Sequence, residues 1–317
     1  RSKRARFIGN INLEYSFTDA LKFNVLLGST YSNSKDNSFT PLLPSFLNAT
    51  PSGSDGSSFD TDWITEYTLN YNKKIGDHQI TALGGFTAQR TRNESNSITS
   101  VSYPNNIIPY LSAVNGLFSG GTSTVSEFSL ISYLARVNYN YKGKYYVTVS
   151  TRADGSSRFG SENKYAVFPS AALAWRISDE GFMKDFRPVS DLKARLSYGQ
   201  TGNNNIGNTS AFANINSVKY PIGNTAAGGY VWGNIPNPNL TWEKQASLNA
   251  GIDLGVLAGR IKLSVDYFKT QNKGLLLNVN IPRTTGFSTA LQNIGQVNNT
   301  GWEFVVSTVN LKNKFQW

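Results

Sequence analysis

The chain has 317 residues, contains no cysteine and carries a formal net charge of +10. The missing cysteines exclude disulfides, thiolate catalysis and Cys-ligated metals within it, and a single histidine, His78, excludes a histidine cluster for zinc. Basic residues gather only in Arg1–Arg6, which we interpret as a solvated loop end rather than a nucleic-acid-binding arm. No apolar run approaches the ~20 residues of a membrane helix, but a membrane β-barrel hides its apolar surface in every second residue.

Strict alternation of apolar and polar residues predicts an all-β, antiparallel structure. In 241–254, for example, Leu248 and Ile252 fall on one face of the strand, and Asn249 and Asp253 fall on the other. Most predicted strands have the ~9–11 residues that a membrane-barrel strand needs, whereas globular strands usually have ~5–6. The pattern predicts about eleven strands: 7–17, 21–31, 62–72, 78–90, 126–141, 144–153, 164–177, 190–200, 241–254, 259–270 and 299–309.

Short and long connections alternate along the chain, which is the arrangement of an outer-membrane barrel with short periplasmic turns and long outer loops. In 178–189, on the short-turn side, residues 179–184 suggest a single helical turn. His78 is interpreted as a turn residue. The predicted tight turns are 18–19, 75–77, 142–143 and 256–259, and the predicted long loops are 32–61, 91–125, 153–163, 201–240 and 271–298.

Aromatic residues bracket the apolar face at both ends of the predicted strands, as expected for girdles at two membrane interfaces. Strands that leave long loops open this face with Trp63, Trp242 and Trp302. Strands that approach short turns end it with Tyr15, Phe17, Tyr71, Tyr139, Tyr141 and Trp175.

Charged residues are segregated between the two faces. Lys244 and Lys269 are the only charges on the predicted lipid face, near loop ends where they can snorkel, and Leu248 and Val265 are expected near mid-span. The charges expected on the lumen face are Arg136, Lys193, Arg195, Glu243, Asp253, Asp266 and Glu303.

The ends of the chain suggest a fragment. Residues 312–317 look like the start of a further strand, and eleven strands plus a stub do not make the even number of a closed bacterial barrel. Unpaired strand edges are costly in lipid. We therefore expect residues 1–317 to be part of a larger barrel domain.

Several motifs in 139–302 occur in an order that resembles the SusC/RagA family of TonB-dependent transporters from Bacteroidetes, whereas 1–138 matches only in style. The motifs are the stretches 139–146, 152–160, 168–170, 174–180, 196–203, 237–244, 266–268 and 293–301.

The resemblance implies an outer-membrane barrel of about 22 strands, filled by a plug and energised by the TonB complex through its N-terminal part. It also implies a SusD-like lipoprotein as partner, outer-membrane lipid around the wall, and oligosaccharides or peptides as substrates. The plug, the TonB box and the final strands are expected to lie outside this chain. The segment would then form the barrel wall and the loops on the outer side.

No enzyme, cofactor, metal or nucleic-acid site is expected. The stretch 152–160 lacks the Lys-Ser/Thr of a phosphate loop and the spaced carboxylates of a calcium loop, so an extracellular hairpin is the interpretation. Residues 199–202 are not followed by a helical pattern, so a dinucleotide site fails as well. Four residues are candidates for ligand contact: Tyr230, Trp232, Asn203 and Asn204. The two aromatic residues lie in the longest loop and could instead pack it, and the two asparagines are turn formers first and ligand contacts second.

Two alternatives remain open from the sequence. A passive porin or structural outer-membrane protein would share the barrel but lack a plug and a TonB box. A soluble extracellular β-domain that binds or cleaves glycans would instead bury the apolar strand faces in a core.

Overall fold

The computed structural model describes residues 1–41, 51–113, 118–183, 185–186 and 188–310. Within these ranges the chain forms strands and four short 3-10 turns. None of the helices there is long and apolar enough to span a membrane. The predicted strand start at 312–317 lies outside the described residues.

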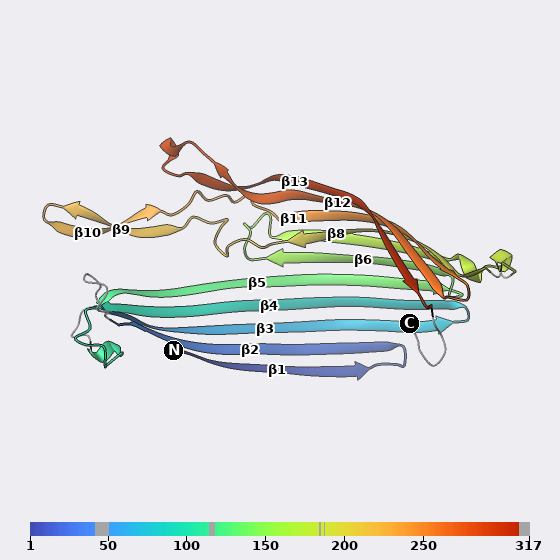
Figure 1. Cartoon of the computed structure of the whole chain (residues 1–317), viewed down its shortest axis with the longest axis horizontal. Helices are drawn as coiled ribbons and strands as arrows, with labels where there is room; N and C mark the ends of the chain where they lie inside the picture. Colours follow the sequence, from blue (N-terminus) through green and yellow to red (C-terminus); the bar gives the residue numbers. More distant parts are fainter. Residues whose placement is uncertain (42–50, 114–117, 184, 187, 311–317) are drawn as a thin grey trace. The chain divides into compact units, whose positions relative to one another are not determined.

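Eleven strands form one antiparallel sheet whose order follows the chain, and two further strands form a separate hairpin (Figure 1). The hairpin consists of β9 (Ile215–Ile222) and β10 (Thr225–Trp232). Because β8 pairs directly with β11, the hairpin interrupts the chain but not the sheet. The sheet strands in order are β1 (Ser2–Ser16), β2 (Leu21–Thr40), β3 (Ser52–Ile75), β4 (His78–Val101), β5 (Phe118–Tyr141), β6 (Tyr145–Ser156), β7 (Tyr165–Arg176), β8 (Val189–Asn203), β11 (Glu243–Val256), β12 (Ile261–Asn280) and β13 (Thr289–Thr308).

The chain divides into two compact units. The first comprises Arg1–Leu13, Val25–Glu66 and Thr87–Leu130, and is held by strand pairing and polar contacts such as the 2.7 Å ion pair between Arg90 and Glu127. The second comprises Glu14–Asn24, Tyr67–Phe86 and Ile131–Trp317.

All eleven predicted strands are present, but most are longer than predicted. β2 continues to Thr40 and β12 to Asn280, so the predicted loops 32–61 and 271–298 are largely strand where they are described. Beyond the alternating stretch of β2, backbone pairing continues with mostly polar side chains on both faces, whereas the outer part of β12 contains the consecutive apolar residues Leu275, Leu276 and Leu277. In neither segment do apolar and polar residues alternate, so the hydropathy pattern did not indicate a strand and predicted a loop instead.

The short turns were predicted correctly, and several of them need left-handed backbone. Gly76 has φ +57° between β3 and β4, and Lys142 and Gly143 have φ +54° and +69° between β5 and β6. A glycine adopts this region without the penalty of a Cβ atom. The expected helical turn in 178–189 is a pair of 3-10 turns, Ile177–Asp179 and Gly181–Met183. His78 opens β4 instead of lying in the turn, and its Nδ1 is 2.7 Å from the hydroxyl of Tyr139.

The strand register confirms the two predicted faces in the second unit. Opposed residues of antiparallel strands share a face, and Ile252 opposes Val265 while Asp253 opposes Ser264. On the apolar face, interior strands leave their side chains uncovered: Leu173 is 51% exposed, Leu196 47% and Ile252 53%. These strands have neighbours on both sides, so the exposure is not an edge effect. A soluble β-domain would bury this face in a core, and that alternative does not fit.

Two predictions about the apolar face were wrong. Lys269 lies directly opposite Leu248, so Leu248 cannot be mid-span while Lys269 is near a loop end. The pair Ile252 and Val265 lies four residues further from the long-loop end. Trp242, predicted as a girdle residue, is only 4% exposed because it precedes β11 and packs inside the loops.

The girdle at the short-turn end is present. The rings of Tyr141 and Tyr145 stack with centroids 6.2 Å apart, and Tyr145 stacks on Trp175 at 6.3 Å. His78 extends this row with its centroid 4.8 Å from that of Tyr141. Aromatic side chains thus line four neighbouring strand ends, where an apolar body and a polar tip suit a membrane interface.

Candidate functional site

The lumen face of the second unit carries an ion-pair network across three strands. Arg195 on β8 pairs with Asp253 on β11 at 2.8 Å and with Asp266 on β12 at 3.0 Å. Ser264 Oγ donates to Asp253 at 2.7 Å. The guanidinium of Arg195 binds both carboxylates at once, which holds the three side chains against the wall.

Gly251 makes this network possible. It lies between Arg195 and Asp266 in the register, and a Cβ at this position would overlap Asp266 Oδ1 and lie 2.9 Å from Arg195 Nη2. Within the described chain, Asp266 Oδ1 is buried without a hydrogen-bond partner. The wall is therefore tightly packed here on its polar side.

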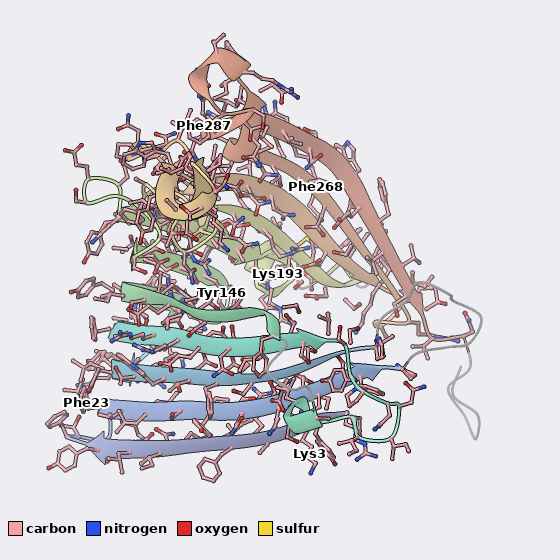
Figure 2. The ribbon with its side chains drawn as sticks, turned by 90° about the vertical axis from the view of Figure 1, so that its left-hand side faces the viewer. Lys3, Phe23, Tyr146, Lys193, Phe268 and Phe287 are labelled. Carbon is pink, nitrogen blue, oxygen red and sulfur yellow. The ribbon has the colours of Figure 1, made fainter. Side chains whose placement is uncertain are left out.

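Further charged residues join the same face. Glu303 opposes Asp266, and Lys193 opposes Asp253. Lys193 Nζ also lies 5.6 Å from the ring centroid of Tyr146, and Figure 2 shows the two labelled residues close together. Charges predicted for the lumen face thus gather into one polar surface. The described residues include no cluster of three or more His, Cys, Asp or Glu side chains placed to hold a metal ion.

At the long-loop end, the loops around β7 and β11 form a small buried core. Phe159 and Leu240 are fully buried, and Trp242 packs between Phe159 and Phe168 with ring centroids 5.4 and 5.6 Å away. The indole nitrogen of Trp242 donates to the backbone oxygen of Lys164 at 3.0 Å. This core holds the loop bases in place above the wall.

One cleft of about 350 Å³ opens where β8, β11 and β12 reach this end. Asn203 Nδ2 donates to Glu243 Oε2 at 2.7 Å, and the other carboxylate oxygen accepts the backbone N–H of Leu276 at 2.8 Å. Thr201 and Gln245 continue the polar lining on the same face. The cleft lining includes Glu243 on the lumen face and its neighbour Lys244, which alternates to the opposite, predicted lipid face of β11.

A second cleft of about 320 Å³ lies between the base of the β9–β10 hairpin and the β12–β13 connection. None of its lining residues is charged. Asn234 braces it by accepting the N–H of Asn214 at 2.7 Å and donating to Phe212 at 2.9 Å. Phe287, labelled in Figure 2, also lines it, together with Asn278.

The four predicted contact residues fall into two separate groups. Tyr230 and Trp232 lie on one face of β10 and are 78% and 63% exposed, so they do not pack the loop. Asn203 lines the lumen-side cleft, and Asn204 donates to Ser156 at 3.1 Å. No hydrogen bond or ring contact joins the two groups within the described ranges.

Asn204 is held from a second side. Its backbone oxygen accepts a hydrogen bond from Arg158 Nη1 at 3.0 Å, and burial lowers the pKa of that guanidinium. Asn204 therefore braces the loop, whereas Asn203 lines the cleft, where its side chain donates to Glu243 and accepts the backbone N–H of Asn205.

The sequence did not indicate the uncharged cleft or the hairpin. A turn signal was present, because Gly223-Asn224 sits between two runs rich in β-branched and aromatic residues. The cleft itself had no local signal, since its lining comes from four distant segments.

The family model described as "TonB dependent receptor-like, beta-barrel" matches residues 1–317. The TonB-dependent receptor P3 of Formosa agariphila is 34% identical over 99% of this chain and 32% of its own length. The TonB-dependent receptor SusC of Bacteroides thetaiotaomicron is 40% identical over 62% of this chain and 20% of its own length. The chain thus spans about a third of the length of the first of these relatives.

Solved structures give the same result. The RagAB peptide transporter matches 99% of this chain and 35% of its own, with a TM-score of 0.90 and 27% identity. The ferric-catecholate receptor Fiu of E. coli K12 shares the fold with a TM-score of 0.56 at 11% identity. The polar lumen face, the exposed apolar face and these matches agree: the chain belongs to the TonB-dependent receptor β-barrel family of outer-membrane transporters, and it is of the SusC/RagA type.

Proposed function

We propose that the intact gene product imports oligosaccharides or peptides across the outer membrane, driven by the TonB complex through a plug domain. This chain would form part of the conduit wall and the outer loops. The observation that carries the proposal is the charged and hydrogen-bonded lumen face, centred on Arg195, in a chain that matches the RagAB peptide transporter over 99% of its residues.

The two clefts at the long-loop end support substrate contact there. Asn203 and Glu243 line the lumen-side cleft, where a ligand would meet an amide and a carboxylate. Asn278 and Phe287 line the uncharged cleft, which offers an amide and a ring face to a neutral polar ligand. Tyr230 and Trp232 add an exposed aromatic surface beside it on the hairpin.

From the family resemblance, we propose a SusD-like surface lipoprotein as the partner. Its contact surface would be the loops at the long-loop end, including the β9–β10 hairpin. The support is the similarity of this chain to the RagAB peptide transporter and to SusC, which is 40% identical over the aligned residues.

The direct test compares uptake with and without TonB. Labelled oligosaccharides and peptides are supplied to cells that carry the intact gene, in wild-type and TonB-deletion backgrounds. Active import predicts uptake that disappears without TonB. Uptake that persists at the same rate in the deletion strain would favour the passive porin alternative.

A second test concerns topology. Cysteines placed at Asp77 and Lys142, in short turns, should react only from the periplasm, and a cysteine at Asn224, in the hairpin turn, should react from outside intact cells. A membrane-impermeant maleimide applied before and after outer-membrane permeabilisation makes the distinction. Equal labelling of all three sites in intact cells would refute this orientation.

A further inference from the structure

The connection between β7 and β8 exposes large apolar side chains at the short-turn end. Phe182 is 69% exposed and Phe186 is 53% exposed, although the segment is folded by backbone hydrogen bonds such as Met183 N to Glu180 O at 3.1 Å. In Figure 1 this yellow-green connection projects at the end of the strands opposite to the β9–β10 hairpin. Water would be an unfavourable environment for these rings.

Glu180 ties the connection to the aromatic girdle. Its carboxylate accepts hydrogen bonds from the hydroxyl of Tyr145 at 2.6 Å and the indole nitrogen of Trp175 at 3.2 Å, and pairs with Lys144 at 3.1 Å. Tyr145 and Trp175 oppose each other on the lipid face of β6 and β7. The connection is therefore attached to the lipid-facing side of the wall at the level where the girdle meets the headgroups.

A neighbouring turn adds a third apolar side chain. Leu257, between β11 and β12, is 60% exposed and has φ +53°, a conformation that is rare for a residue with a Cβ atom. Its backbone N–H donates to the oxygen of Pro188 at 3.3 Å, which joins this turn to the end of the β7–β8 connection. Phe182, Phe186 and Leu257 thus belong to two linked connections.

We infer that Phe182, Phe186 and Leu257 form a membrane-surface anchor that inserts into the phospholipid headgroup region at the short-turn end. The occupant of this apolar surface is the lipid monolayer, because the surface continues the lipid-facing girdle through Glu180. Apolar side chains on short interfacial segments bind at the boundary of headgroups and acyl chains in this way. The anchor fixes the height of the wall in the membrane and does not depend on what is transported.

Site-directed spin labelling tests the inference on the intact protein in phospholipid vesicles. Cysteines replace Phe182, Phe186 and Leu257 one at a time, and Asp185, an exposed polar residue of the same connection, is the matched control. This chain contributes no background thiol. At the three apolar positions, collision of the label with oxygen should exceed collision with a water-soluble nickel chelate, and at Asp185 the order should reverse.

A companion variant checks the attachment. Glu180→Ala should increase the mobility of a label at Phe182 and shift it toward the aqueous accessibility of Asp185. If the labels at Phe182 and Phe186 are as accessible to the nickel chelate as the label at Asp185, the anchor does not exist. If the labels at Phe182 and Phe186 are equally lipid-exposed in the wild-type background and in the Glu180→Ala variant, Glu180 does not attach the connection to the girdle, and the inferred attachment is wrong.

Discussion

The two faces of β8, β11 and β12 place opposite chemistry on the same backbone. On one face, Arg195, Asp253 and Asp266 satisfy one another through short ion pairs. On the other, Leu196 and Ile252 stay exposed on interior strands. A water-soluble sheet would cover the apolar face, whereas here lipid covers it. The free-energy cost of placing a charged side chain on these strands therefore depends on which face it occupies.

The largest expected effect comes from placing a charge on the apolar face. Ile252→Arg should destabilise the refolded intact protein by up to ~2–4 kcal/mol, because an arginine on the lipid face of a barrel is costly and its cost is largest at the bilayer midplane. Asn249→Arg, on the lumen face of the same strand, should cost much less because its guanidinium stays in water. Urea unfolding in lipid vesicles measures both. Similar costs would show that the face assignment is wrong.

The next effect comes from breaking the polar network on the other face. Arg195→Met should cost about 1–3 kcal/mol, because it leaves Asp253 and Asp266 close together without their cation. The triple variant with Asp253→Asn and Asp266→Asn should recover much of this loss, since no unpaired charge remains. A triple variant less stable than Arg195→Met would contradict charge pairing as the cause.

A smaller effect should follow from crowding the network. Gly251→Ala places a methyl group against Asp266 and Arg195, and displacing them should cost about 1 kcal/mol. Gly84→Ala is the control, because a Cβ there meets open space. The same urea assay compares the two variants. An equal response would mean that the ion pairs move aside freely.

The smallest effect concerns pH at the turn that ends β7. Hydrogen bonds from Tyr145 and Trp175, together with Lys144, lower the pKa of Glu180 to about 2. Because the folded pKa is depressed, the stabilisation is present above the ordinary value near 4.5 and is lost only as pH falls through about 2. A spin label at Phe182 should thus keep its mobility from neutral pH to about 3. Release between pH 4 and 5 would contradict this assignment.

The sequence predicted the eleven strands because alternation has a period of two wherever one face meets lipid and the other meets water. It underestimated the length of β2, whose outer part is mostly polar on both faces, and of β12, whose outer part contains three consecutive leucines, so neither segment alternates. It also placed Lys269 near a loop end and Leu248 near mid-span, although the two residues lie directly opposite each other. The register between two strands cannot be read from the sequence of either strand alone.

The candidate site was less predictable. Asn203 was identified from its loop, and it does line a cleft, but its partner Glu243 comes from a strand 40 residues away. Trp242 was assigned to the girdle by its position, whereas packing on Phe159 and Phe168 buries it. Such loop packing depends on contacts between distant segments, which carry no local periodicity.

The β9–β10 hairpin has a consequence for how such proteins diversify. The strands on either side of it, β8 and β11, pair with each other from Glu243 and Asn203 onward, so the hairpin adds no strand to the main sheet. Its sequence can therefore lengthen, shorten or be exchanged between related genes without shifting the register of the wall. Mutations can accumulate in this insertion while the barrel is inherited unchanged, which separates the evolution of surface recognition from that of the membrane scaffold.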